Sequence, residues 1–291
     1  MSSDAIRQLK WREVASNCGF TEGPVSRGDQ ILFTSINRGL LYVADLAGGG
    51  AKQFAETGGG PNGAALDVAG NIWVAQNGGK VVPTKSTVAC PPSIQKVGTD
   101  GTVAVVAQAG FSAPNDCAFG PDGRLWFTDP TGSSEVHEPK PGRLWALDVK
   151  TGVCELILDG LAHPNGLAFG LDPTTLYVGE TRRGHIIKLE KSPEGWRHAG
   201  VYAVLSHGEP DGMAFDQAGR LWVAATKADA LVVIDAGGKT SRTVPIGPSF
   251  PTNVCFAGDD LRTLVVTAPK GGRVLCATVA EPGIKLAVGI A

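Results

Sequence analysis

The 291-residue sequence has neither a long apolar run nor a basic run. No segment approaches the length needed to span a bilayer, and residues 1–17 contain no apolar stretch able to form the core of a signal sequence. The formal net charge is -2 and the pI is near 6.2, so no long-range attraction draws the chain to phosphate backbones or anionic lipid. We therefore expect no nucleic-acid partner, no membrane partner and a cytoplasmic protein.

Closely spaced cysteines and helical periodicity are also missing. The 6 cysteines are scattered without C-x-x-C spacing, which is typical of small apolar residues in strands of a reducing compartment. None of the 5 histidines is placed to partner a catalytic thiol. No segment has a long apolar period of 3.6 residues, which predicts almost no helix. The 40 glycines and 19 prolines indicate frequent turns instead.

A repeat anchored on proline is what the chain does contain. Five prolines, spaced 41 to 53 residues apart, are each followed five residues later by Leu or Phe and then by a β-prone run. The segments are PNGAAL at 61–66, PNDCAF at 114–119, PNGLAF at 164–169, PDGMAF at 210–215 and PTNVCF at 251–256. A period of this size indicates a blade repeat. Repeats fill the chain from Glu22 to about Val279, so we expect one domain over residues 1–291.

Each unit continues into further short β-prone runs bounded by turn residues. Second strands are expected at 71–76, 124–129, 175–180, 220–225 and 263–268, third strands at 93–98, 143–148, 185–190, 230–235 and 273–278, and outer strands at 103–108 and 154–159. A first unit starts at Glu22, and residues 11–16 can supply the strand that the last unit lacks. The sequence predicts an all-β, six-bladed β-propeller with four antiparallel strands per blade, closed by an N-terminal strand.

The residue after the proline in five units, and Glu22 in the first unit, are predicted to lie in one ring at the mouth of the central channel. The positions are Glu22, Asn62, Asn115, Asn165, Asp211 and, in the sixth blade, Thr252. A lone Pro-Asn-Gly is an ordinary turn, but packing alone does not require acceptors that face one another across a channel. Two close carboxylates repel unless a cation lies between them, and oxygen ligands without His or thiolate suit Ca²⁺, Mg²⁺ or Mn²⁺.

Four motifs resemble a known family: TEGPV at 21–25, PNDCAFGPDGRLWFTDP at 114–130, HPNGLAF at 163–169 and PDGMAFDQAGRLWV at 210–223. They are similar to the senescence-marker-protein/gluconolactonase/luciferin-regenerating-enzyme family, which includes regucalcin and is related to diisopropyl fluorophosphatase. The resemblance runs from about residue 11 to 280. It implies one divalent cation held by Glu22, Asn115, Asn165 and Asp211, with Ca²⁺ expected first and Zn²⁺, Mg²⁺ or Mn²⁺ as alternatives.

The resemblance also implies hydrolysis of a small-molecule substrate, a sugar lactone or a related small lactone. The cation would polarise the carbonyl while water attacks it. Asp211 is the candidate catalytic residue, either activating water or attacking directly as a nucleophile. Two alternatives stay open: a phosphotriesterase of the diisopropyl fluorophosphatase type, which the PNDCAF segment also resembles, and a non-catalytic calcium-binding propeller.

Four further residues are substrate-binding candidates near the same mouth. Asp116 matches the family's Asn-Asp pair, and Asn62 occupies a ring position outside the four implied ligands. Asp129 and Arg182 follow strands that end at this mouth. Each of the four can also be explained as a turn residue.

Two features depart from the family. Regucalcin-like sugar lactonases carry an Arg two residues before the ligand Asn, whereas this chain has Ala113, which removes an anchor for sugar hydroxyls. An insertion at 80–95, rich in Pro, Thr and Ser, has the length of a lid or a binding element. The sequence leaves the oligomeric state open.

Overall fold

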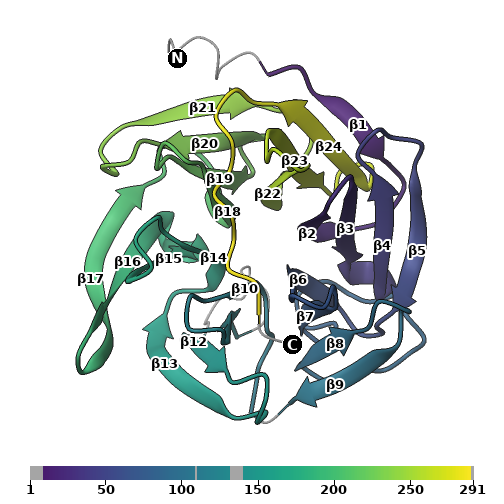
Figure 1. Ribbon diagram of the computed structural model, residues 1–291, viewed down its shortest axis with the longest axis horizontal. Helices are drawn as coiled ribbons and strands as arrows, with labels where there is room; N and C mark the ends of the chain where they lie inside the picture. Colours follow the sequence, from purple (N-terminus) through teal and green to yellow (C-terminus); the bar gives the residue numbers. More distant parts are fainter. Residues whose placement is uncertain (1–8, 109, 132–139, 290–291) are drawn as a thin grey trace.

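The computed structural model describes residues 9–108, 110–131 and 140–289 and confirms the predicted propeller. Within these ranges, six antiparallel sheets of four strands surround a central channel (Figure 1). The helical elements of the same residues are two single-turn 3-10 helices, η1 (Ile36–Arg38) and η2 (Thr181–Arg183). No helix in the described part of the chain is long and apolar enough to cross a membrane.

The blades follow one another in chain order, each running from an inner strand at the channel to an outer strand at the rim. Blade 1 contains β2 (Thr21–Arg27), β3 (Gln30–Ser35), β4 (Leu40–Asp45) and β5 (Ala51–Glu56). Blade 2 contains β6 (Pro61–Leu66), β7 (Ile72–Gln76), β8 (Ser93–Val97) and β9 (Val103–Ala107). Blade 3 contains β10 (Cys117–Phe119), β11 (Leu125–Asp129), β12 (Gly142–Leu147) and β13 (Cys154–Leu161).

The second half of the ring repeats this order. Blade 4 contains β14 (Pro164–Phe169), β15 (Thr175–Glu180), β16 (His185–Ser192) and β17 (Gly195–Val204). Blade 5 contains β18 (Glu209–Phe215), β19 (Leu221–Thr226), β20 (Ala230–Ile234) and β21 (Ser241–Pro245). Blade 6 contains β22 (Asn253–Ala257), β23 (Thr263–Ala268) and β24 (Arg273–Thr278), with β1 (Arg12–Ala15) as its outer strand.

The two ends of the propeller chain meet in blade 6, as the sequence predicts. Strand β1 pairs antiparallel with β24, with Arg12 opposite Cys276 and Glu13 opposite Leu275. Val14 of β1 is buried against blade 1 residues, including Ile31. The N-terminal strand therefore covers the edge that blade 6 would otherwise leave unpaired.

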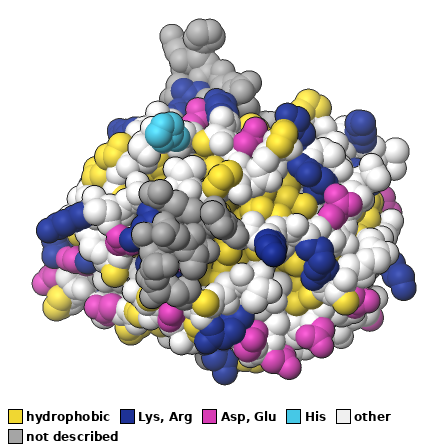
Figure 2. All heavy atoms as spheres, turned by 90° about the horizontal axis from the view of Figure 1, so that it is seen from above, with side chains coloured by type: hydrophobic (Ala, Val, Ile, Leu, Met, Phe, Trp, Pro, Cys, Tyr) yellow, Lys and Arg dark blue, Asp and Glu magenta, His cyan; other side chains and the backbone are white. Residues whose placement is uncertain are grey.

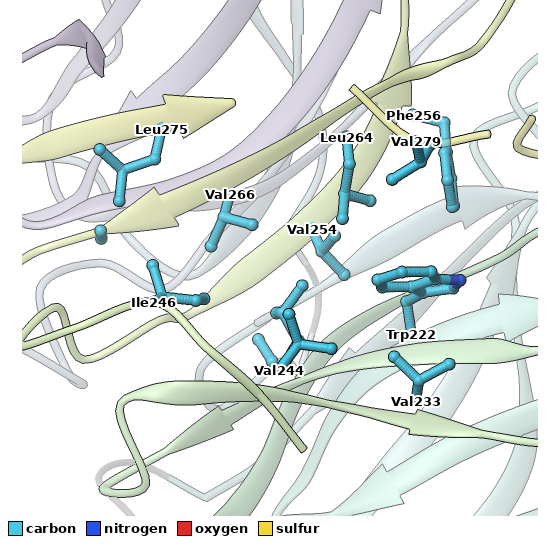
Figure 3. Close-up of a cluster of buried hydrophobic side chains, with 13 residues drawn as sticks. Trp222, Val233, Val244, Ile246, Val254, Phe256, Leu264, Val266, Leu275 and Val279 are labelled. Carbon is cyan, nitrogen blue, oxygen red and sulfur yellow. The ribbon is translucent and has the colours of Figure 1, made fainter. Parts of the chain in front are cut away.

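The hydrophobic core lies between neighbouring blades and not in the channel. Figure 3 shows the contact of blades 5 and 6, where Trp222 and Val233 of one blade face Val254 and Leu264 of the next. Trp222 also meets the ring of Phe256 edge-on at 6.2 Å. Each fully buried apolar side chain of this kind stabilises the fold by about 1.5–3 kcal/mol. Because the blades hold one another, the channel is free to carry polar groups.

The inner strands share an irregularity at the predicted ring position. The pairing register with the second strand shifts between Glu22 and Val25, Pro61 and Ala64, Pro164 and Leu167, and Pro210 and Met213. Such a bulge turns successive side chains away from strict alternation. The residue after the ring position in these four blades is glycine, at 23, 63, 166 and 212. A β-carbon at Gly63 would lie 2.5 Å from the Cα of Asp116, so the bulged strands approach one another too closely for a side chain there.

After β24, the chain turns back across the channel. We call the end where inner strands begin the upper mouth and the end where they finish the lower mouth. Residues 283–289 cross the lower mouth (Figure 1), with isolated bridges from Gly283 to Asp216 in blade 5 and from Gly289 to Asp67 in blade 2. Between this tail and the ring lies a cavity of about 630 Å³, bordered by apolar side chains that include Leu66 and Phe256. The tail is one wall of this lower chamber.

The insertion at 80–95 lies beside the upper mouth. Its last residues belong to β8, which begins at Ser93. The carbonyl of Val88 accepts a hydrogen bond from the Gly59 N–H at 3.0 Å, and the Lys85 N–H donates to the carbonyl of Asn37 at 2.7 Å. The insertion is thus fastened to blades 1 and 2, next to the ring positions. Its role as a lid or binding element stays a prediction.

The surface carries charges of both signs. On the face shown in Figure 2, Lys and Arg side chains are interspersed with Asp and Glu, and no patch of one sign spans that face. This mixture agrees with a formal net charge of only -2.

Candidate metal centre

The upper end of the channel brings together five polar residues from the first five blades. Glu22, Asn62, Asn115, Asn165 and Asp211 are all buried, with 2% to 8% of each residue exposed. Four of them lie in the bulged part of inner strands, and Asn115 lies just before β10. Residues separated by up to 189 positions in the chain thus occupy equivalent places around one channel.

Four side-chain oxygens of this ring lack protein donors. Oδ1 of Asn62, Asn115, Asn165 and Asp211 is buried, and none of these atoms has a hydrogen-bond partner among the described residues. Buried acceptors in folded proteins are normally paired, because an unpaired one costs about 1–3 kcal/mol. Four unpaired oxygens at one end of a channel fit the coordination preference of a hard divalent cation. Oxygen ligands of this kind also suit Mg²⁺ and Mn²⁺, so the ligand chemistry alone does not distinguish these ions from Ca²⁺.

Below this ring, a link of side chains crosses the channel. Asn253 of blade 6 donates from Nδ2 to Oε2 of Glu22 at 3.0 Å, and the same nitrogen lies 3.4 Å from Oδ2 of Asp116 in blade 3. Glu22 Oε2 also accepts from the Gly23 N–H at 2.7 Å. Blades 3 and 6 face each other in the six-blade circle (Figure 1), so the link spans a diameter. It fixes the Glu22 carboxylate in the ring.

Sequence reasoning overlooked Asn253. Asp116 and Asn253 follow the ring position in blades 3 and 6, where the other four blades have glycine. The replacement of glycine by a polar residue at this repeat position in two of the six blades is the sequence signal from which Asn253 could have been predicted. Thr252, which holds the ring position in blade 6, donates from Oγ1 to the carbonyl of Thr21 at 2.9 Å. Its hydroxyl is therefore engaged by the backbone.

The carboxyl groups of the site have strongly perturbed pKa values. Burial, followed by the nearby Asp116, raises the pKa of Glu22 to about 8. Burial also raises the pKa of Asp116 to about 7. The pKa of Asp211 lies well above its usual range because of burial first and then the charges of Glu22 and Asp116. A cation among these groups would favour their ionised forms and reverse the shifts.

Amide ligands are essential to any cation site here. No group of three His, Cys, Asp or Glu side chains within the described ranges is arranged to hold a metal ion. Two ring carboxylates, Glu22 and Asp211, would therefore act together with ring asparagines. The Asn165 side chain also lowers the pKa of the Asp211 carboxyl, so an amide and a carboxylate of adjacent blades interact here.

Threonines of one blade hold the ring backbone of the next. Thr34 Oγ1 donates to the carbonyl of Asn62 at 2.7 Å, and Thr128 Oγ1 donates to the carbonyl of Asn165 at 2.8 Å. These bonds join the second strand of a blade to the inner strand of its neighbour. They set the depth of the ring residues in the channel independently of any ligand.

Asp129, predicted as a substrate-binding candidate near the mouth, has a carboxylate that is paired with protein groups. The structure places it fully buried, with Oδ1 accepting from the N–H groups of Ser112 at 2.9 Å and Ala113 at 2.7 Å. Its Oδ2 accepts from Nη2 of Arg143 at 2.7 Å. These contacts make Asp129 an anchor for the loop that leads to Asn115. Substrate binding by Asp129 stays an untested prediction.

Arg182 lies near the upper mouth in η2, as its predicted role requires. It is half-buried, and its backbone N–H donates to the carbonyl of Ala162 at 3.4 Å. The neighbouring His163 is buried and has a left-handed φ of 57°. Burial and the Arg182 charge lower the pKa of His163 to about 4, so its imidazole is neutral at physiological pH. The Arg182 guanidinium and the neutral His163 imidazole therefore lie close to each other, and His163 is two residues before the ring residue Asn165.

Two other buried polar atoms belong to loops at the upper end. Nδ2 of Asn77 and Oγ of Ser249 have no hydrogen-bond partner within the described ranges. Asn77 follows β7, and its Oδ1 would lie 2.3 Å from a β-carbon at Gly60. Ser249 lies two residues before Pro251. Neither residue was singled out by the repeat, because both lie outside the proline-anchored segments.

Residues 20–270 match the family model of the SMP-30/gluconolactonase/LRE-like region. The chain belongs to this family. It is 27% identical over 299 residues to the gluconolactonase of Zymomonas mobilis subsp. mobilis, covering 88% of this chain and 78% of that protein. It is 25% identical over 249 residues to the 6-deoxy-6-sulfogluconolactonase of Pseudomonas putida, covering 82% of each.

Solved structures of the family share the propeller. Regucalcin of Agrobacterium tumefaciens, a calcium-binding protein, superimposes with a TM-score of 0.80 and 17% sequence identity, over 97% of this chain and 98% of that one. At this identity the likeness concerns the fold. The family match confirms the resemblance that the four sequence motifs indicated.

Proposed function

We propose that this protein is a lactonase that opens a sugar lactone or a related small lactone with the help of one divalent cation, Ca²⁺ in the first place. The family match and the gluconolactonase names of its relatives support the reaction class. The structural observation that carries the proposal is the ring of buried oxygens without protein partners. The calcium-binding neighbour in the same family supports the choice of ion.

Glu22, Asn115, Asn165 and Asp211 would hold the cation. Each offers an oxygen, and the set contains neither imidazole nor thiolate, which suits a hard ion. The pKa values of Glu22 and Asp211 are raised by burial first and then by neighbouring carboxylates, Asp116 for both and Glu22 for Asp211, and a bound cation would offset these effects. Four ligands leave positions for water and for a substrate oxygen.

A divalent cation at this position supplies Lewis acidity, which polarises a carbonyl and stabilises the charge that develops on its oxygen. The Asp211 carboxylate takes a proton from the attacking water, whose oxygen bonds to the carbonyl carbon. As the ring C–O bond then breaks, Asp211 passes this proton to the departing ring oxygen, which becomes a hydroxyl group. The side chain of Asn165 interacts with the Asp211 carboxylate and favours its ionised form, which the base requires. Asn253 holds Glu22 through the 3.0 Å hydrogen bond, so the second carboxylate stays in place during the reaction.

The upper mouth would bind the rest of the substrate. Arg182 and His163 lie beside Asn165 and offer a charged donor and a neutral imidazole to hydroxyl or carboxylate groups. Asp116, linked to Asn253, sits below the ring and supports the ligands from there. Ala113 is fully buried, so this position contributes no anchor, and sugar recognition falls to the blade 4 side of the mouth.

A substrate panel tests the proposal. Aldonolactones, γ-lactones and homoserine lactones are assayed with Ca²⁺ and after EDTA treatment, and we expect turnover of at least one lactone that is lost with EDTA and restored by Ca²⁺. Absence of any cation-dependent lactone turnover would refute the proposal. Faster fluoride release from an organofluorophosphate would place the protein with the phosphotriesterases, and Ca²⁺ binding without turnover would make it a binding propeller.

Asp211→Asn separates catalysis from binding. Removing the base should lower kcat by about 10²–10⁴-fold while the fold, followed by circular dichroism, is unchanged. Rapid-quench mass spectrometry of the wild-type protein distinguishes the two roles of Asp211. A transient adduct of substrate mass on the protein would assign it as the nucleophile instead of the base.

A further inference from the structure

The ring position of blade 2 has the same local structure as the ring positions assigned to the cation. Strand β6 shows the register shift between Pro61 and Ala64 that recurs in blades 1, 4 and 5. Asn62, inside this shift, is only 2% exposed. The bulge therefore presents its side chain as the equivalent bulges present Glu22 and Asp211.

Close contacts on both sides fix Asn62 between two of the assigned ligands. A β-carbon at Gly23, next to Glu22, would lie 2.3 Å from the carbonyl oxygen of Asn62. On the other side, the N–H of Gly63 donates to the carbonyl of Asn115 at 2.6 Å. The hydroxyl of Thr34, which lies opposite Glu22 in blade 1, donates to the Asn62 carbonyl at 2.7 Å. The backbone of Asn62 is thus tied to the ring before any ligand binds.

The side-chain oxygen of Asn62 is buried and unpartnered like Oδ1 of three of the four assigned ligands. Its Oδ1 is one of the four buried ring oxygens that have no partner among the described residues, together with Oδ1 of Asn115, Asn165 and Asp211. Thr252, the other neutral ring residue, differs because its hydroxyl donates to the Thr21 carbonyl. The two neutral positions therefore do not share one role.

We propose that Asn62 is a fifth protein ligand of the divalent cation, through Oδ1. This inference rests on the cation of the proposed function but not on the reaction. Five protein oxygens from five consecutive blades leave one to three positions in the six- to eight-fold sphere of Ca²⁺. Mg²⁺ prefers a strict octahedron with several retained waters, so a fifth protein oxygen favours Ca²⁺ over Mg²⁺.

Eu³⁺ luminescence tests the proposal by counting bound waters. Eu³⁺ replaces Ca²⁺ in oxygen sites, and its lifetimes in H₂O and D₂O give the number of inner-sphere waters. Asn62→Ala should gain one bound water relative to the wild-type protein, and its Ca²⁺ affinity by calorimetry should fall at least about tenfold. Thr252→Val, the matched ring variant, should leave the water count unchanged.

Asn62→Leu, which is close to Asn in size, keeps the measurement interpretable if the alanine variant folds poorly. The Ca²⁺/Mg²⁺ affinity ratio should fall in both Asn62 variants and stay constant in Thr252→Val. An unchanged water count together with an unchanged Ca²⁺ affinity in folded Asn62 variants would overturn the proposal. A wild-type protein that binds neither ion would overturn it together with the cation of the proposed function, whereas ion binding without lactone turnover would refute only the hydrolase.

Discussion

The buried carboxyl of Glu22 makes the stability of the cation-free protein depend on pH. Its pKa of about 8 in the folded protein lies above the value expected in the unfolded chain, so the folded state holds the proton more tightly. Below the pKa that Glu22 has in the unfolded chain, its ionisation does not lower the free energy of unfolding. The loss of stability grows as the pH rises and is complete above about pH 8. Asp116, with a pKa of about 7, acts in the same direction.

We therefore predict that the EDTA-treated protein loses stability as the pH rises from 6.5 to 8. Each such group contributes up to about 1.4 kcal/mol per pH unit. Urea unfolding at several pH values measures the slope, and added Ca²⁺ should reduce it. Glu22→Gln, which cannot ionise, should flatten the curve; an equal slope in this variant would show that other groups cause it.

Asp129 is predicted to act on the cation through the loop that it anchors. Asp129→Ala leaves the Ser112 and Ala113 N–H groups and Arg143 without their acceptor, and should destabilise the fold by about 3 kcal/mol. Because the same loop leads to Asn115, calorimetry should also show weaker Ca²⁺ binding.

Asp216→Ala is the matched control for Asp129. Asp216 is also fully buried and paired with an arginine, Arg220, but it lies at the lower end of blade 5. Its loss should reduce stability without a comparable loss of Ca²⁺ affinity. Equal affinity losses in the two variants would indicate a general effect of destabilisation and not a positioning role of Asp129.

At the level of whole strands, the bulges at the ring require glycine. A β-carbon at Gly63 would lie 2.3 Å from Oδ1 and 2.5 Å from Cα of Asp116, so Gly63→Ala must push β6 away from the loop of blade 3. We predict a destabilisation of about 1–3 kcal/mol and weaker Ca²⁺ binding, measured by urea unfolding and calorimetry. Gly237→Ala is the control, since a β-carbon there meets nothing within 4 Å. Similar effects of both substitutions would contradict a steric role for Gly63.

Strands and ring positions could be predicted from sequence because their signals are local. Strand β15 (Thr175–Glu180), for example, has the bounds that its β-branched and aromatic residues predict. The replacement of glycine could have singled out Asp116 and Asn253, but their hydrogen bond could not be predicted, because the two side chains meet only after blades 3 and 6 have closed the circle. The hydrogen bonds of Asp129 could not be predicted either. Its position at a strand end predicted a place near the mouth, but the loop that contains Ser112 meets its carboxylate only in the folded protein.

The C-terminal tail was likewise missed at the sequence level. Residues 283–289 carry no repeat signal, and their bridging partners Asp67 and Asp216 belong to blades 2 and 5. Gly289 packs so closely on Phe119 that a β-carbon would lie 2.1 Å from its ring. Such contacts exist only once the propeller is complete, so a reading of segments in isolation cannot supply them.

For the whole molecule, the tail is predicted to cover the lower chamber. A chain ending at Pro282 should have a lower melting temperature and should bind a hydrophobic fluorescent dye more strongly, because the walls lined by Phe119 and Phe256 become accessible. Ca²⁺ affinity should change little, since the ring lies at the other end of the channel. Lys285→Ala, in the exposed part of the tail, should behave as the wild-type protein does; unchanged dye binding after truncation would show that the tail does not cover the chamber.

The propeller is tied across its interior along two diameters. The tail joins blade 5 to blade 2 below the chamber, and Asn253 reaches from blade 6 toward Asp116 of blade 3. A propeller whose blades touch only their neighbours can be deformed from a circle into an oval. Two contacts that cross the channel, between opposite blades, resist this deformation. We therefore expect the width of the upper mouth to vary little, so that the proposed lactonase selects its substrates by size and does not widen to admit larger ones.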